Sequence, residues 1–269
     1  MIHYRRQFGF SLIEVMLATG ILGVGLVLIA MVFPVGIKLT SITTERTIGA
    51  IAADEAFAKI RLWGFPKAEN WPNQTSVEFL QLLNTLPGWS AVDLPWKEFL
   101  YESDEGSDRQ RVYHWSALCR KLSDNEVQVT VFVTRKVAPN IQFRSSENLG
   151  TGPLPATNQP WPSPVTLRLG YEGNPKELKI VTLLWGDEYD FFSAGTALVD
   201  DRSGRLYYVQ ETQDKNGDGL RETLVLREPY VPPEAGDNFW FWVIPPGIGS
   251  PRNPVVTVRQ AVLPIQPQP

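Results

Sequence analysis

The sequence has 269 residues, a formal net charge of -4 at pH 7 and 43% hydrophobic residues, enough for one large or two small folded domains. The acidic balance argues against nucleic acid as the main ligand. Cys119 is the only cysteine, so no disulfide forms within one chain, and we expect a free, buried thiol.

An apolar stretch from Phe10 to Ile37 follows the basic pair Arg5-Arg6, and Glu14 is its only charged residue. A helix over residues 10–37 would be about 42 Å long, which exceeds the apolar thickness of a bilayer, about 30 Å. We therefore predict a single transmembrane helix. Because Arg5 and Arg6 precede it, we expect the N-terminus in the cytoplasm and the C-terminal bulk outside.

Three ordinary kinds of N-terminal segment share part of this pattern. A secretory signal peptide has a shorter apolar region and a small-residue cleavage site, and neither feature is found here. A twin-arginine signal would need a cleavage site after the apolar stretch. A plain membrane anchor gives Glu14 no role, since a carboxylate costs at least about 2.5 kcal/mol at the bilayer centre. Glu14 therefore needs a partner, or must reach the membrane interface.

The residues around Glu14 resemble the class III signal of type IV prepilins and pseudopilins. They read Gly9, then Phe10-Ser11-Leu12-Ile13-Glu14, then the apolar stretch. The resemblance implies that a prepilin peptidase cuts after Gly9 on the cytoplasmic side and methylates the new amino group of Phe10. It also implies that Glu14 pairs with the N-terminal ammonium of a neighbouring subunit during filament assembly. Loss of residues 1–9 removes Arg5 and Arg6, which leaves 23 basic against 29 acidic residues and a net charge of -6.

The helix is predicted to continue beyond the membrane. Small and hydrophobic residues recur at helical spacing at Leu39, Ile42, Gly49, Ala53, Phe57 and Ile60. Gly64 and Pro66 mark its end. A second, short helix is predicted over residues 76–86, because Thr75 and Glu78 have the spacing of a capping box.

From Arg111 the hydrophobic pattern changes to a period of two. Residues 111–122 and 126–137 are predicted to form paired strands joined by a turn at 123–125. One face of the second strand carries Val127, Val129, Val131 and Val133. Further strand candidates are 178–185, 196–200, 205–211, 222–227, 238–244 and 255–262.

These elements predict an α+β fold in which a long N-terminal helix packs on an antiparallel sheet, with a second, C-terminal β-rich unit. The predicted parts are a leader peptide (1–9), a transmembrane and filament-core helix (10–37), a pilin-like helix and β head (38–144), a Pro-rich linker or loop (145–165) and the C-terminal β-rich unit (166–269).

One segment has the composition of a metal site. Asp214, Asn216, Asp218 and Glu222 place oxygen ligands around a Gly-rich turn, which suits a hard cation such as calcium. The flanking sequence is strand-like and Val225 stands where an EF-hand has Glu, so the segment resembles the shorter calcium loops of extracellular proteins. The alternative is a metal-free hairpin turn, since Asn-Gly and Asp-Gly are strong turn signals.

No pattern of catalytic residues stands out. Beyond the leader His114 is the only histidine, and no nucleophile elbow, phosphate loop or zinc spacing is found. We therefore expect a protein that is not an enzyme.

The resemblance implies a prepilin-like subunit of a type IV pilus or type II secretion pseudopilus in the inner membrane, with a prepilin peptidase and other pilin or pseudopilin subunits as partners. The large head and the lack of a disulfide favour a minor subunit. The alternative is a single-span anchored envelope protein whose exposed β domain binds calcium or another ligand.

Overall fold

The computed structural model describes residues 9–62, 77–79, 99–101, 112–136, 138, 140–144, 158–159, 161–171, 173–181, 188–217, 219–232, 238–250 and 252–265. By its internal contacts the chain divides into two units, Met1–Thr47 and Ile48–Pro269, and each is described by itself.

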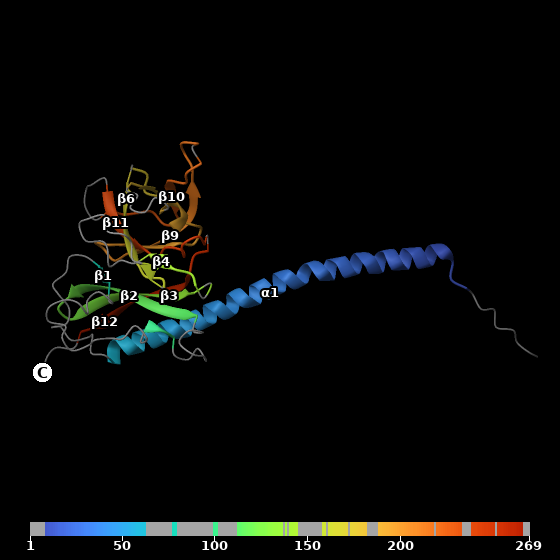
Figure 1. The fold of residues 1–269 in the computed structure, drawn as a ribbon, viewed down its shortest axis with the longest axis horizontal. Helices are drawn as coiled ribbons and strands as arrows, with labels where there is room; N and C mark the ends of the chain where they lie inside the picture. Colours follow the sequence, from blue (N-terminus) through green and yellow to red (C-terminus); the bar gives the residue numbers. More distant parts are fainter. Residues whose placement is uncertain are drawn as a thin grey trace, which may run out of the picture. The chain divides into compact units, whose positions relative to one another are not determined.

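The first unit consists of most of the long helix α1, which runs from Leu12 to Leu62 and confirms the predicted N-terminal helix (Figure 1). The helix continues through Pro34. Several threonines bond back to the chain, as Thr40 and Thr43 do when they donate to the carbonyls of Gly36 and Leu39 over 2.9 Å. These bonds satisfy the threonine hydroxyls within the helix itself.

The last turns of α1 belong to the second unit, where one face of the helix is buried. The buried residues are Gly49, Ala52, Ala53, Ala56, Phe57 and Ile60. Four of them, Gly49, Ala53, Phe57 and Ile60, belong to the set predicted from the helical spacing. The other two members of that set, Leu39 and Ile42, are 60% and 37% exposed. The helix ends at Leu62, and the predicted terminators Gly64 and Pro66 lie outside the described residues.

A four-stranded antiparallel sheet covers the buried face of α1. Its strands, in spatial order, are β1 (Glu78–Phe79), β2 (Tyr113–Ser123), β3 (Glu126–Arg135) and β12 (Val255–Pro264). The predicted hairpin of β2 and β3 is confirmed, and the four valines of β3 pack with α1 in one core. The Cys119 thiol is buried in that core and forms no disulfide.

The predicted helix over residues 76–86 is wrong at the residues that the structure describes. Glu78 and Phe79 pair with Cys119 and Leu118 as a short strand, because pairing with β2 outweighs the local capping signal. Residues 80–86 lie outside the described part of the chain.

A closed six-stranded barrel forms a second core. Its strands are β6 (Val165–Gly170), β7 (Glu177–Ile180), β8 (Ala197–Asp200), β9 (Leu206–Gln213), β10 (Thr223–Leu226) and β11 (Asn238–Val243). Side chains alternate along β11, so Phe239 and Phe241 lie inside the barrel and Trp242 packs outside it. Residues 165–170 were not among the strand candidates, and β6 is therefore an addition to the predicted fold.

A smaller two-stranded sheet joins β4 (Phe143–Arg144) to β5 (Asn158–Gln159). β5 lies inside the segment 145–165 that the proline content assigns to a loop, so that assignment is wrong at residues 158–159. The backbone pairing with β4 accounts for the difference.

The last strand corrects the predicted division of the chain. β12 pairs with β3 from Glu126 to Thr134, so the end of the range 166–269 belongs to the sheet of the head, and the barrel is inserted between β3 and β12. β12 covers the edge of β3, and Leu263 reaches the core that contains α1. Figure 1 shows the barrel strands grouped together beside the sheet.

The barrel packs on the face of the sheet that points away from α1. Leu118 and Phe132 of the sheet share a buried cluster with Val199 and Trp242 of the barrel. Polar contacts surround this cluster at the turn from β8 to β9. Gln260 Nε2 donates to the Gly204 carbonyl over 2.8 Å, and a guanidinium N–H of Arg120 donates to the Ser203 carbonyl over 2.6 Å.

Replacing Gly204 by alanine is expected to lower the free energy of unfolding by about 1–2 kcal/mol, because its φ of +67° lies in the left-handed region and the new Cβ would meet the side chain of Gln128. Gly173→Ala is the matched control, since Gly173 has a φ of +92° but no atom near its Cβ position. Denaturant unfolding of both variants separates the two effects, because both variants suffer backbone strain but only Gly204→Ala also brings a Cβ against the side chain of Gln128. Equal losses would contradict a packing role for Gly204.

Candidate processing and assembly site

The predicted cleavage site lies directly before α1. Gly9 and Phe10 are exposed and non-helical, and the helix begins at Leu12. Phe10 is 86% exposed. The peptide bond between Gly9 and Phe10 is therefore presented in a non-helical segment.

Glu14 has a partner within its own chain. Its Oε2 accepts hydrogen bonds from the Ser11 backbone N–H over 3.0 Å and from the Ser11 hydroxyl over 3.1 Å. The backbone N–H of Glu14 donates in return to the Ser11 hydroxyl over 3.3 Å. This is a capping box, in which two side chains satisfy the first donors of a helix reciprocally.

Sequence reasoning assigned Glu14 to a neighbouring subunit and gave Ser11 no role in the helix start, although the Ser-x-x-Glu spacing is a signal for a capping box. The contact places a carboxylate at the positive end of the helix dipole. Ser11 and Glu14 are both exposed, so the carboxylate is accessible to a cation from outside the chain.

Ser11→Ala is expected to weaken the start of α1 by about 1 kcal/mol, because the variant loses the hydroxyl that caps the helix. Faster amide hydrogen exchange at residues 12–15 of the chain in lipid nanodiscs is the measurement. Ser11→Thr keeps the hydroxyl and should exchange as the wild type does. Unchanged exchange in Ser11→Ala would contradict the capping role.

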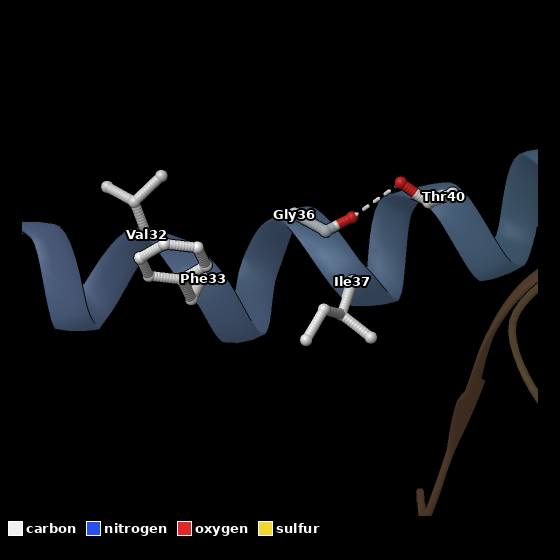
Figure 2. A pocket seen from close by; sticks show the side chains of 5 residues that line it. All are labelled: Val32, Phe33, Gly36, Ile37 and Thr40. Atoms are coloured by element: carbon white, nitrogen blue, oxygen red, sulfur yellow. Dashed lines mark hydrogen bonds between the residues drawn. The ribbon is translucent and has the colours of Figure 1, made fainter.

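In the described part of the chain, α1 is the one helix long and apolar enough to cross a membrane. Figure 2 shows part of this apolar half, where Val32, Phe33, Ile37 and Thr40 surround a shallow, open notch at Gly36. The Thr40 hydroxyl donates to the Gly36 carbonyl, so the notch exposes no unpaired donor. Small residues four apart suit close packing between helices in a membrane.

The candidate calcium segment forms the connection from β9 to β10. The two carboxylate oxygens of Asp214 accept the backbone N–H groups of Gly217 over 2.6 Å and Gly219 over 2.8 Å. Lys215 forms an ion pair with Glu177 of β7. Gly217 and Gly219 have φ of +73° and +88°, as left-handed turn positions require. Asp214 thus organises the loop through backbone contacts.

The other candidate ligands are placed differently. Asn216 is exposed, whereas Glu222 is 5% exposed and lies two residues before Leu224, which faces the barrel core. Asp218 lies outside the described residues. Among the residues that the structure describes, no three His, Cys, Asp or Glu side chains gather as a metal site would require.

Calcium ligation by Asp214, Asn216, Asp218 and Glu222 stays a prediction, and the contacts seen favour its alternative, the metal-free loop. We expect isothermal titration of the chain with calcium to give no binding heat, because Asp214 already accepts two N–H groups and Glu222 is buried. A one-to-one binding heat that Asp214→Ala abolishes would instead establish the calcium loop.

Comparison with known proteins bears on the N-terminal site. The model of the prokaryotic N-terminal methylation motif matches residues 4–30, a range that includes Gly9, Phe10, Ser11 and Glu14. No curated protein and no solved structure matches the chain. The chain carries the class III signal peptide of type IV pilin- and pseudopilin-like proteins.

Proposed function

We propose that the protein is a prepilin-like, minor subunit of a type IV pilus or a type II secretion pseudopilus. In this proposal a prepilin peptidase cuts after Gly9 and methylates Phe10, and the subunit then joins other pilin or pseudopilin subunits through α1. The observation that carries the proposal is the arrangement at Gly9–Glu14, where an exposed, non-helical bond precedes an acid-capped apolar helix within a matched methylation motif.

The proposed cycle begins in the inner membrane, with the N-terminus in the cytoplasm and the head outside. Cleavage creates an ammonium on Phe10, and methylation keeps its charge. A neighbouring Glu14 carboxylate is the natural partner for that ammonium in an apolar filament core, where an unpaired charge is costly. The notch at Gly36 supports close approach of another helix.

The proposed role is mechanical and not catalytic. A minor place in the filament is supported by the barrel inserted between β3 and β12, which enlarges the head beyond its helix and sheet. The alternative from another class is a single-span anchored envelope protein with a ligand-binding head. The two functions differ at one step, because an anchor has no need of a cut after Gly9.

The test is intact mass spectrometry of the protein co-expressed with a prepilin peptidase. The expected product starts at N-methylated Phe10. An inactive peptidase is the matched control and should leave the chain uncut. A chain that keeps its leader in the presence of active peptidase would overturn the proposal and leave the anchored envelope protein.

A further inference from the structure

The short 3-10 helix η4, from Glu188 to Phe191, packs against the barrel core. Phe191 and Phe192 are packed into the barrel core, at 4% and 5% exposed. Two further segments lie at one end of the barrel. The loop from β9 to β10 meets the end of β7 there, since the Ile180 N–H donates to the Glu222 carbonyl. The segment after β11 begins at the same end, because β11 ends opposite Val165, the first residue of β6.

Two clefts flank η4 at this end of the barrel. One has about 280 Å³ and lies between η4 and the loop Gly219–Arg221, with Phe192 among its lining residues. The other has about 260 Å³ and lies between η4 and the segment Pro246–Ser250, with Arg144 and Phe191 among its lining residues. Asp190 lines both clefts, so a ligand that crosses η4 would meet its carboxylate on the way.

The larger cleft contains two charged side chains, those of Asp190 and Arg221, that make no polar contact within the described part of the chain. Asp190 and Arg221 are both exposed, and neither forms a hydrogen bond or ion pair with the residues that the structure describes. They come from different segments of the cleft wall. In the smaller cleft the Arg144 guanidinium lies over the Phe191 ring at 6.0 Å, which holds a second cation beside η4. Each cleft thus has one arginine in its lining, and Asp190 is common to both.

Hydrogen bonds of the backbone hold the walls of the larger cleft in place. Asp214 fixes Gly217 and Gly219 on one side. On the other side the backbone N–H of Ser193 donates to the Thr196 hydroxyl over 3.0 Å, and the N–H of Gly195 donates to the Val209 carbonyl over 2.8 Å. A pre-formed site of this kind loses less entropy on binding than a flexible one.

The chemistry of the clefts selects one class of ligand. A carboxylate accepts N–H groups and a guanidinium donates to carbonyl groups, so the two match the alternating donors and acceptors of a peptide backbone. Alternate side chains of an extended peptide point to the same side, and each cleft has the size for one side chain. Nucleic acid is disfavoured by the shared carboxylate.

We propose that this end of the barrel binds an extended peptide segment of a partner protein, which crosses η4 at Asp190 and places side chains in the two clefts. Asp190 accepts backbone N–H groups of the peptide and Arg221 donates to its carbonyl groups. This proposal concerns the head alone and does not depend on cleavage or filament assembly.

The test is selection of a random-peptide phage library on the full chain in lipid nanodiscs, with empty nanodiscs as counter-selection. Enriched peptides are expected to bind the double variant Asp190→Asn, Arg221→Gln at least tenfold more weakly than the wild type. The control Glu228→Gln, Lys176→Gln removes one acid and one base that line neither cleft, and should bind as the wild type does.

Two outcomes would overturn the proposal. One is no enrichment of peptides over empty nanodiscs. The other is enriched peptides that bind the wild type and the Asp190→Asn, Arg221→Gln variant equally, which would place their site elsewhere on the head.

Discussion

Replacing Glu14 by alanine is expected to lower incorporation of the subunit into filaments at least about tenfold, or about 1.4 kcal/mol, while cleavage after Gly9 continues. In the proposed assembly the variant leaves the neighbouring ammonium without a counter-charge in an apolar core, where breaking a buried pair costs about 3–5 kcal/mol. The measurement is the ratio of subunit in sheared filaments to subunit left in the membrane. Intact mass of the membrane fraction reports cleavage.

The capping box makes Glu14→Gln the informative control. Glutamine also fits the fourth position of a capping box, so this variant preserves the start of α1 while removing the charge. If the ion pair governs assembly, Glu14→Gln should fail as Glu14→Ala does. If the helix cap governs assembly, Glu14→Gln should incorporate normally, and that result would contradict the pairing argument.

The elements that the sequence predicts well are those with a strong local pattern. α1 follows from a long apolar stretch and then a helical spacing of small residues, and Gly49, Ala53, Phe57 and Ile60 are buried as that spacing predicts. β2 and β3 follow from strict alternation and a short polar turn. The valine face of β3 packs on α1, so both its existence and its orientation could be read from the chain.

The features that could not be predicted depend on partners distant in sequence. β12 pairs with β3 across an inserted barrel, and Gln260 bonds Thr130 over 2.7 Å. The pattern at residues 255–262 predicts a strand, but it does not predict which other strand will pair with it. The same reason explains the error at Glu78, where pairing with β2 replaces a locally plausible helix.

The candidate sites divide in the same way. Gly9, Phe10 and Glu14 are recognisable because the motif is contiguous, and the match over residues 4–30 supports it. The Ser-x-x-Glu spacing serves the helix cap as well, which sequence reasoning missed. Asp190 and Arg221 line the same cleft only because the barrel brings η4 and the loop from β9 to β10 to one end, so no local pattern could have predicted the pair.

Acidification is expected to destabilise the head through His114. Its imidazole is 7% exposed and stacks on Trp161, with ring centroids 5.5 Å apart. Burial lowers the pKa of His114 from its ordinary value of 6.5 to about 3. The Lys136 ammonium lies 5.0 Å from the centroid of the Trp161 ring. Because this neighbouring charge is positive, it does not favour protonation of His114. The folded protein therefore keeps His114 neutral.

The direction of the pH effect follows from this difference. The unfolded chain takes up a proton on His114 below pH 6.5 and the folded chain does so only near pH 3, so the free energy of unfolding falls as the pH drops through this window. The loss from this residue is about 2 kcal/mol by pH 5, and about 4–5 kcal/mol below pH 3.

His114→Phe isolates this contribution, because phenylalanine keeps an aromatic ring beside Trp161 but binds no proton. Carboxylates elsewhere titrate in both proteins, so the quantity to compare is the change in unfolding free energy between pH 7 and pH 5. The wild type should lose about 2 kcal/mol more than the variant over this interval. Equal losses would show that His114 titrates alike in the folded and unfolded chains, and would contradict a buried, neutral imidazole that links stability of the head to pH.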